Sequence, residues 1–307
     1  MSRALSHPIA WILGVSAGLI WLAAPLKGAA GAPASAEPDF APNGSVGWIA
    51  LAPAFIAPPS GPGPLRADPA HPRVGNDEFR ASGAQPTFPI ADLDNPILQP
   101  WVKERLRQRK ELILSGKPAF PPQASCWPAG LPGFLLYPVQ PVYFVQTPKE
   151  VLMIWQADHQ VRHVYLGAEH SGVVRPSWYG ESIGHYEGNA LVVDTIGLDT
   201  RTLVDNYQTP HTERLHTVER FHIIDGGKTL EVNLTVEDPG AFTMPWNAVQ
   251  RYRRVEPGKF ENTEPLNPVA SGGTAGPMLE ASCAENPDVS LFGEGARPIP
   301  TAAKPDF

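Results

Sequence analysis

Basic residues and cysteines are scarce in this sequence of 307 residues. The 24 Lys and Arg residues are outnumbered by 31 Asp and Glu residues, which gives a formal net charge of -7. Binding to nucleic acid requires clustered basic side chains that replace the counterions of the phosphates, so we expect no nucleic-acid partner. The sequence also contains no P-loop and no dinucleotide fingerprint, and we expect no nucleotide cofactor.

Long helices are excluded by the abundance of proline. The chain has 36 prolines and 28 glycines, together about a fifth of its residues. Proline fixes φ and removes a backbone donor, so a chain of this composition cannot be mostly long helix. The composition predicts a protein of strands and loops with irregular ends.

The first 36 residues have the pattern of an export signal. Arg3 supplies the positive charge, residues 9–26 form an uncharged stretch, and Ala34-Ser35-Ala36 is a cleavage motif before Glu37. We therefore predict a signal peptide over residues 1–36, a periplasmic or secreted location, and no stable membrane span after cleavage. The alternative is an uncleaved anchor, but the 18 residues lie at the lower limit for spanning and include two glycines and a proline.

Export affects how the two cysteines are interpreted. Cys126 and Cys283 lie far apart in the sequence, and an oxidising compartment would allow them to pair. Closing so long a loop could contribute about 4–5 kcal/mol through the entropy of the unfolded state. The pattern favours a structural disulfide over two unpaired buried thiols or a catalytic cysteine.

The chain divides into four segments by composition. After the signal peptide, residues 37–90 form a Pro-rich extended arm, partly disordered, whose apolar islands at 48–51 and 54–56 pack on a core built elsewhere. Residues 91–256 form a single β-rich domain, and residues 257–307 an irregular Pro/Gly-rich tail. A helix is predicted over 96–115, with Asn95 as its N-cap, Pro96 at its first position and Gly116 at its end.

From Tyr137 onward the apolar residues recur with a period of two, which indicates strands. The candidate strands are residues 142–146, 151–156, 161–166, 182–187, 190–195, 215–224, 229–236 and 248–254. Turn-forming sequences at 187–189 and 225–227 join two pairs of them into hairpins. Eight short strands with tight turns predict a mainly β fold, an antiparallel barrel or a strongly curved sheet.

Chemistry is expected where the histidines gather, since seven of the nine lie between His159 and His222. On the strand 215–224, the side chains of His216, Arg220 and His222 share one face, and Glu219 points to the other. If the two hairpins are neighbours, a set of imidazoles and carboxylates could converge: His185, Glu187, Asp194, His211, His216 and His222.

Three interpretations of this set remain open. Imidazole beside carboxylate suits general acid–base catalysis, with His216 or His185 as the base and Glu187 or Asp194 orienting the ring. Alternatively, His211, His216 and His222 could hold a divalent metal, zinc or copper; apart from such a metal we expect no cofactor. In the third interpretation the histidines are structural or lie at the surface.

Two arginines and several aromatic residues are candidates for substrate binding. A buried Arg162 would pair with Glu187 or Asp194 as a structural ion pair, which is the favoured interpretation, or would hold an anionic substrate. Arg162 or Arg220 would also stabilise negative charge that develops in a substrate. Trp155, Trp178 and Tyr186 could line a cavity for an apolar or aromatic small molecule, although filling of the core explains them equally well.

A serine hydrolase is not expected. Residues 180–184 (GESIG) match the spacing G-x-S-x-G. The nucleophile elbow of such enzymes needs a strand before it, a helix after it and a doubly wound sheet around it. Here a second strand-like stretch follows, and the sequence shows no alternation of strands and helices.

Several motifs resemble a large, mostly uncharacterised family of exported bacterial proteins. They are SCWPAGLP (125–132), WYGESIGHYEGNALVVDT (178–195), HTERLHTVERF (211–221), VEDP (236–239) and PW (245–246). The resemblance covers roughly residues 89–285 and implies export and an all-β core, without a reaction. Asn189 stands where the family often has Asp, so no role is expected for an acid at that turn. The strand pattern also resembles lipocalin-type barrels, an analogy of fold alone.

Together these observations predict an exported protein that binds or acts on a small, apolar or aromatic molecule in a cavity lined by histidines and carboxylates. General acid–base chemistry of the isomerase, lyase or hydrolase type is the leading hypothesis. The alternatives are a non-catalytic carrier with the same cavity, and a structural or interaction protein of the cell envelope.

Overall fold

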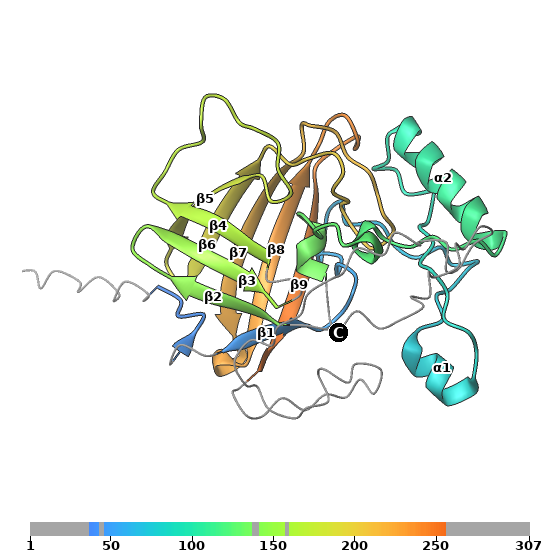
Figure 1. Ribbon diagram of the computed structural model, residues 1–307, viewed down its shortest axis with the longest axis horizontal. Coiled ribbons are helices and arrows are strands. Elements are labelled where there is room, and N and C mark those ends of the chain that lie inside the picture. Colours follow the sequence, from blue (N-terminus) through green and yellow to red (C-terminus); the bar gives the residue numbers. More distant parts are fainter. Residues whose placement is uncertain (1–36, 43–45, 137–140, 157–159, 256–307) are drawn as a thin grey trace, which may run out of the picture. The chain divides into compact units, whose positions relative to one another are not determined.

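The computed structural model describes residues 37–42, 46–136, 141–156 and 160–255 (Figure 1). The predicted signal peptide, the C-terminal tail with Cys283, and His159 lie outside the described residues. The disulfide between Cys126 and Cys283 therefore stays a prediction. None of the helices in the described ranges is long and apolar enough to cross a membrane.

Nine strands close into a barrel, which confirms the predicted mainly β fold (Figure 1). Neighbours in the barrel follow the order of the sequence, and β1 pairs with both β2 and β9. The strands are β1 (Gly47–Ala50), β2 (Val142–Gln146), β3 (Glu150–Trp155), β4 (Gln160–Leu166), β5 (Glu181–Glu187), β6 (Ala190–Ile196), β7 (His216–Ile224), β8 (Thr229–Glu237) and β9 (Trp246–Val255). Eight of them lie where the period of two predicts them.

The pairing differs from the prediction at one place. Strands β4 and β5 run parallel, with Val164 opposite Ser182 and Leu166 opposite Gly184, and all other neighbours are antiparallel. Parallel neighbours cannot be joined by a tight hairpin. The connection over residues 167–180 returns the chain to the same end of the barrel, and the sequence contains no period that would indicate it.

The Pro-rich arm takes part in the barrel, which the sequence did not predict. Strand β1 comes from this segment and closes the barrel between β2 and β9. Of the two apolar islands, Trp48 is fully buried and Phe55 is 9% exposed, whereas Leu51 and Ile56 lie at the surface. The arm also contains a short helix, α1 (Asn76–Ser82).

The predicted helix exists but begins later than expected. Helix α2 spans Pro100–Leu114, with Gln99 as N-cap and Pro100 at the first position. Asn95 instead caps a turn, where its side chain accepts a hydrogen bond from the backbone of Ile97 at 3.1 Å. The backbone of residues 97–99 pairs with residues 241–243, and these tertiary hydrogen bonds prevent an earlier helical start.

Short 3-10 turns complete the described elements. Turns η2 (Pro122–Ser125) and η3 (Gly133–Leu136) lie in the segment between α2 and β2, and η5 (Asp225–Gly227) joins β7 to β8. The buried face of η3, which includes Leu135, packs into the main core.

The interior of the barrel is filled by side chains. Strand β8 shows the pattern clearly, because its alternate residues Leu230, Val232, Leu234 and Val236 are all at most 1% exposed. Large residues from other strands, such as Trp48, occupy the same core. Alternation of apolar and polar residues along the strands thus produces a barrel with a packed interior and a solvent-exposed outer face.

A buried ion pair lies within this apolar interior. The guanidinium of Arg162 on β4 donates two hydrogen bonds to the carboxylate of Glu219 on β7, one of them 2.9 Å long. It also donates to the hydroxyls of Thr195 at 2.9 Å and Ser182 at 3.2 Å. All four residues are at most 1% exposed. Arg162 is therefore buried and forms a structural ion pair, the interpretation that the sequence favoured.

The predicted partner of Arg162 is wrong. The expectation was Glu187 or Asp194, but both of these carboxylates lie on the outer side of their strands with side chains 47% and 37% exposed. Glu219 provides the interior carboxylate because it alternates with the outward-facing residues of β7.

We expect the substitution Arg162→Met to lower the free energy of unfolding by about 3–5 kcal/mol, because it leaves the Glu219 carboxylate buried without a partner. Urea denaturation of the purified protein measures this loss. The control Arg220→Met removes an exposed ion pair and should cost less than about 1 kcal/mol.

The double variant Arg162→Met with Glu219→Leu should recover most of the loss, since it removes both charges together. An Arg162→Met protein within about 1 kcal/mol of the wild type would contradict the assignment of a buried, charged pair.

Candidate functional site

The predicted site residues of the strands lie on the outer face of the barrel. These are His185, Glu187, Asp194, His216, Arg220 and His222, whose side chains are between 20% and 59% exposed. They do not line the interior, which is occupied by the alternate residues of the same strands. The interior of the barrel is therefore not the predicted cavity lined by histidines and carboxylates.

On that outer face they form three separate groups. The first joins His185, Glu187 and Arg220: the His185 Nε2 lies 2.8 Å from a Glu187 oxygen, and Arg220 donates to the other oxygen. The hydrogen bond from Arg220, and then that from His185, lowers the pKa of Glu187 below its ordinary value.

The second group centres on Asp194 of β6. Its two oxygens contact the Nε2 atoms of His170 at 2.8 Å and His216 at 3.0 Å. The other ring nitrogen of His170 lies 3.1 Å from Glu181. His170 was not among the predicted residues, because it lies in the connection from β4 to β5, where no strand period marks a face.

The third group lies farther along β7, where His222 Nε2 is 3.2 Å from Glu231, which also binds Arg251. His216 and His222 are six residues apart on one strand, a separation of about 20 Å at ~3.3 Å per residue. They therefore cannot act on one substrate atom.

His211 is buried in the loop before β7. Its Nδ1 donates to the Thr212 carbonyl at 2.8 Å, and its Nε2 lies 2.7 Å from the Thr202 hydroxyl. Burial lowers the pKa of His211, which favours the neutral ring. The proposed metal ligands His211, His216 and His222 are not brought together. Within the described residues, no group of three or more His, Cys, Asp or Glu side chains is arranged to hold a metal.

The aromatic candidates have different surroundings. Trp155 is buried in the core against the edge of Phe134, and Tyr186 bonds Gln146 at 2.9 Å. Trp178 lies nearer the surface, where the Arg201 guanidinium stacks 4.5 Å above its ring.

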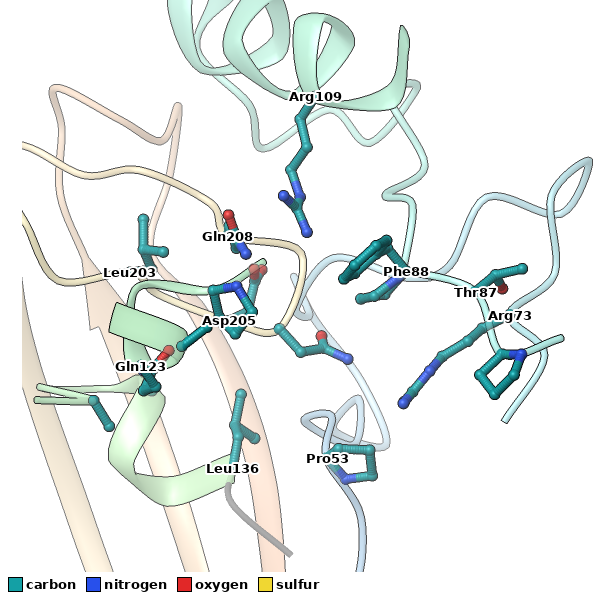
Figure 2. Close-up of a pocket in the computed structure, with 17 residues that line it drawn as sticks. Pro53, Arg73, Thr87, Phe88, Arg109, Gln123, Leu136, Leu203, Asp205 and Gln208 are labelled. Atoms are coloured by element: carbon teal, nitrogen blue, oxygen red, sulfur yellow. The ribbon is translucent and has the colours of Figure 1, made fainter. Parts of the chain in front are cut away.

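A pocket of about 700 Å³ lies elsewhere, among segments that are distant in the sequence (Figure 2). Its walls come from the Pro-rich arm, helix α2, the turns η2 and η3, and residues 203–208. Apolar side chains form much of the lining, among them Pro53, Phe88, Pro121, Leu136 and Leu203. None of the residues predicted from the sequence as a site lines this pocket.

Asp205 carries the negative charge of the pocket. The loop from Leu203 to Thr209 folds around its carboxylate: Oδ1 accepts from the backbone of Tyr207 at 2.9 Å and of Thr209 at 3.1 Å. The Thr209 hydroxyl lies 2.8 Å from both oxygens. Burial raises the pKa of Asp205 to about 6, against the opposing effect of these hydrogen bonds.

Arg109 of α2 points into the same pocket (Figure 2). Its Nε atom is buried and has no hydrogen-bond partner among the described residues. Burial lowers the pKa of Arg109 to about 10, and the charge of Asp205 opposes this shift. The guanidinium is therefore still charged at neutral pH.

Two further polar residues line the pocket. The side-chain oxygen of Asn206 is buried without a hydrogen-bond partner in the described part of the chain. The exposed Arg73 of the arm adds a second positive charge. An unpaired donor and an unpaired acceptor at one concave surface are typical of a site that binds a polar ligand.

Helical spacing could have identified Arg109. Arg109 stands among other basic residues of α2, but Val102 and Leu106 are buried and Arg109 follows on the same side of the helix. Asp205 carried no such signal, since its environment depends on segments far away in the sequence.

Comparison of the chain with protein-family models, with curated proteins and with solved structures yields no match. The geometry of the pocket is accordingly the main guide to a candidate function.

The pKa of Asp205 gives a prediction for stability. Because this pKa is raised from 3.8 to about 6 in the folded protein, the folded state binds the proton more tightly, and folding becomes less favourable as pH rises through this window. Relative to Asp205→Asn, the free energy of unfolding of the wild type should fall by about 2 kcal/mol between pH 4 and pH 7. Chemical denaturation at a series of pH values measures the difference.

Asp199→Asn is a matched control, because the hydrogen bond from Arg201 lowers the pKa of Asp199 instead. The difference in the free energy of unfolding between this variant and the wild type should stay nearly constant above pH 4. If the difference between Asp205→Asn and the wild type were equally constant, the pKa of Asp205 would not be raised by folding.

Proposed function

We propose that the protein is an exported, periplasmic protein that binds a small organic anion with an apolar body in the pocket between the arm, α2 and residues 203–208. The observation that carries this proposal is the Arg109 guanidinium, which lines that pocket and whose buried Nε has no hydrogen-bond partner among the described residues. A buried donor without a partner costs about 1–3 kcal/mol, and a carboxylate would offset this cost through charge-assisted hydrogen bonds.

The charges of the lining support an anion. Arg73 and Arg109 face one carboxylate, that of Asp205, so the pocket carries a surplus of positive charge at neutral pH. The apolar walls, which include the aromatic ring of Phe88, suit the nonpolar part of an organic molecule. The volume lies within the range of about 300–1,000 Å³ that is usual for small-molecule sites.

Binding is favoured over acid–base catalysis by histidine. The general base and its orienting carboxylate were predicted to share one cavity, and the outer-face groups around Glu187, Asp194 and Glu231 share neither a cavity nor a residue with the pocket. The carrier hypothesis needs only the pocket.

Export is supported by the sequence of the first 36 residues and by the resemblance to exported bacterial proteins. The two cysteines, distant in sequence, suit an oxidising compartment.

We expect 3-phenylpropionate, a carboxylate with an aromatic body, to bind the wild type and to bind Arg109→Gln at least about tenfold more weakly, since the variant loses the charged partner of the carboxylate. Isothermal titration calorimetry gives both affinities. Arg105→Gln is the control, because Arg105 is exposed on the same helix and does not line the pocket. Equal binding by the wild type and Arg109→Gln, or no binding by either, would refute the proposal.

The export proposal predicts the mass of the mature protein. When the full chain is expressed in a Gram-negative host, the periplasmic protein should begin at Glu37 and should lack two hydrogens because Cys126 and Cys283 are joined. Intact mass spectrometry before and after reduction measures both properties. A protein that retains Met1, or whose mass is unchanged by reduction, would contradict the respective prediction.

A further inference from the structure

We infer that the pocket recognises a zwitterion, a small α-amino acid with an apolar side chain, whose carboxylate binds Arg109 and whose ammonium group binds Asp205. This inference rests on the proposed function, because it assumes that Arg109 receives the anionic group. It adds the second charged group of the ligand and thereby names the ligand class.

The first support is the unused capacity of the Asp205 carboxylate. Its Oδ1 accepts from two backbone N–H groups, of Tyr207 and Thr209, and lies within reach of the Thr209 hydroxyl. Its Oδ2 has the same hydroxyl as its described partner, and one hydroxyl proton serves one of the two oxygens at a time. Oδ2 can therefore accept further hydrogen bonds from a donor in the pocket.

The second support is that Arg109 and Asp205 do not satisfy each other. The charge of each acts on the other across the pocket, yet Arg109 Nε has no hydrogen-bond partner in the described residues. Figure 2 shows Arg109 descending from α2 and Asp205 held in its loop, with both side chains directed at one space. Two opposite charges that face one cavity without a direct bond fit a ligand that carries both signs.

A ligand with one charge would leave one of these groups in an unfavourable state. A plain carboxylate would place a second negative charge near the buried Asp205, whereas a plain amine would meet Arg109 and Arg73. A zwitterion gives each buried group an opposite charge and a hydrogen bond. The apolar wall with Phe88, Leu136 and Leu203 then accommodates the side chain of the ligand.

A series of matched ligands tests the inference on the mature wild-type protein. L-phenylalanine has both charges, 3-phenylpropionate lacks the ammonium group, phenethylamine lacks the carboxylate, and 3-phenyllactate has a hydroxyl in place of the ammonium. Calorimetry at pH 7.5 should show L-phenylalanine binding at least about tenfold more tightly than each of the other three. L-leucine should bind as well, since the pocket wall is apolar.

Asp205→Asn provides the matched variant. Asn retains an oxygen that accepts from the backbone of Tyr207 and Thr209 but loses the charge, so the preference for L-phenylalanine over 3-phenylpropionate should disappear. The affinity for 3-phenylpropionate should stay the same or increase. Asp199→Asn, which lies outside the pocket, should keep the preference. The ligand series on the wild type decides the question even if Asp205→Asn fails to fold.

The possible results separate the two proposals. If 3-phenylpropionate binds as tightly as L-phenylalanine, the zwitterion inference is overturned and the anion pocket remains. If 3-phenyllactate binds as tightly as L-phenylalanine, the second polar group of the ligand is a neutral donor, and the inference of an ammonium group is overturned. If none of the ligands that carry a carboxylate binds, the proposed function and the inference both fail.

Discussion

The ion pair of Arg162 and Glu219 constrains the whole barrel, because its two charges are stable in an apolar interior only while they bind each other. Arg162 also donates to Ser182 and Thr195, so the group joins β4, β5, β6 and β7. A shift of one residue in β4 would turn Arg162 outward and leave Glu219 buried without a cation. The pair thus fixes the register across the parallel junction of β4 and β5, where no tight hairpin does so.

This packed interior explains why the candidate site lies outside the barrel. Interior polar residues of β9 hold the walls of the pocket in place: the Gln250 amide donates to the carbonyls of Ala52 and Leu135, and the Tyr252 hydroxyl donates to the Leu135 carbonyl as well. Pro53 and Leu136, the next residues in the chain, line the pocket. The barrel core therefore positions the arm and the turn η3 against each other.

The sequence predicted local features well and long-range ones poorly. Alternation located eight strands and separated Glu219 from His216, Arg220 and His222, because a strand places successive side chains on opposite faces. It did not reveal that the histidine face is the outer one, since both faces of β7 carry charged residues. The start of α2 and the role of the arm depend on hydrogen bonds between segments that are far apart in sequence, so no local pattern contains them. The pocket combines such segments as well, and Asp205 was missed for that reason.

The outer-face histidines and the pocket differ in how their charges are satisfied. On the outer face, Glu187, Asp194 and Glu231 each bind two basic side chains, and solvent reaches all three groups. Such pairs contribute little free energy and place no demand on a ligand. Among the described residues, the Nδ1 of His222 is the buried atom of these outer-face groups that has no hydrogen-bond partner, whereas in the pocket Arg109 and Asn206 each have one such atom. In the pocket, two such residues from separate segments line one concave surface together with the charge of Asp205, and this makes the pocket the better candidate for a site that binds a polar ligand.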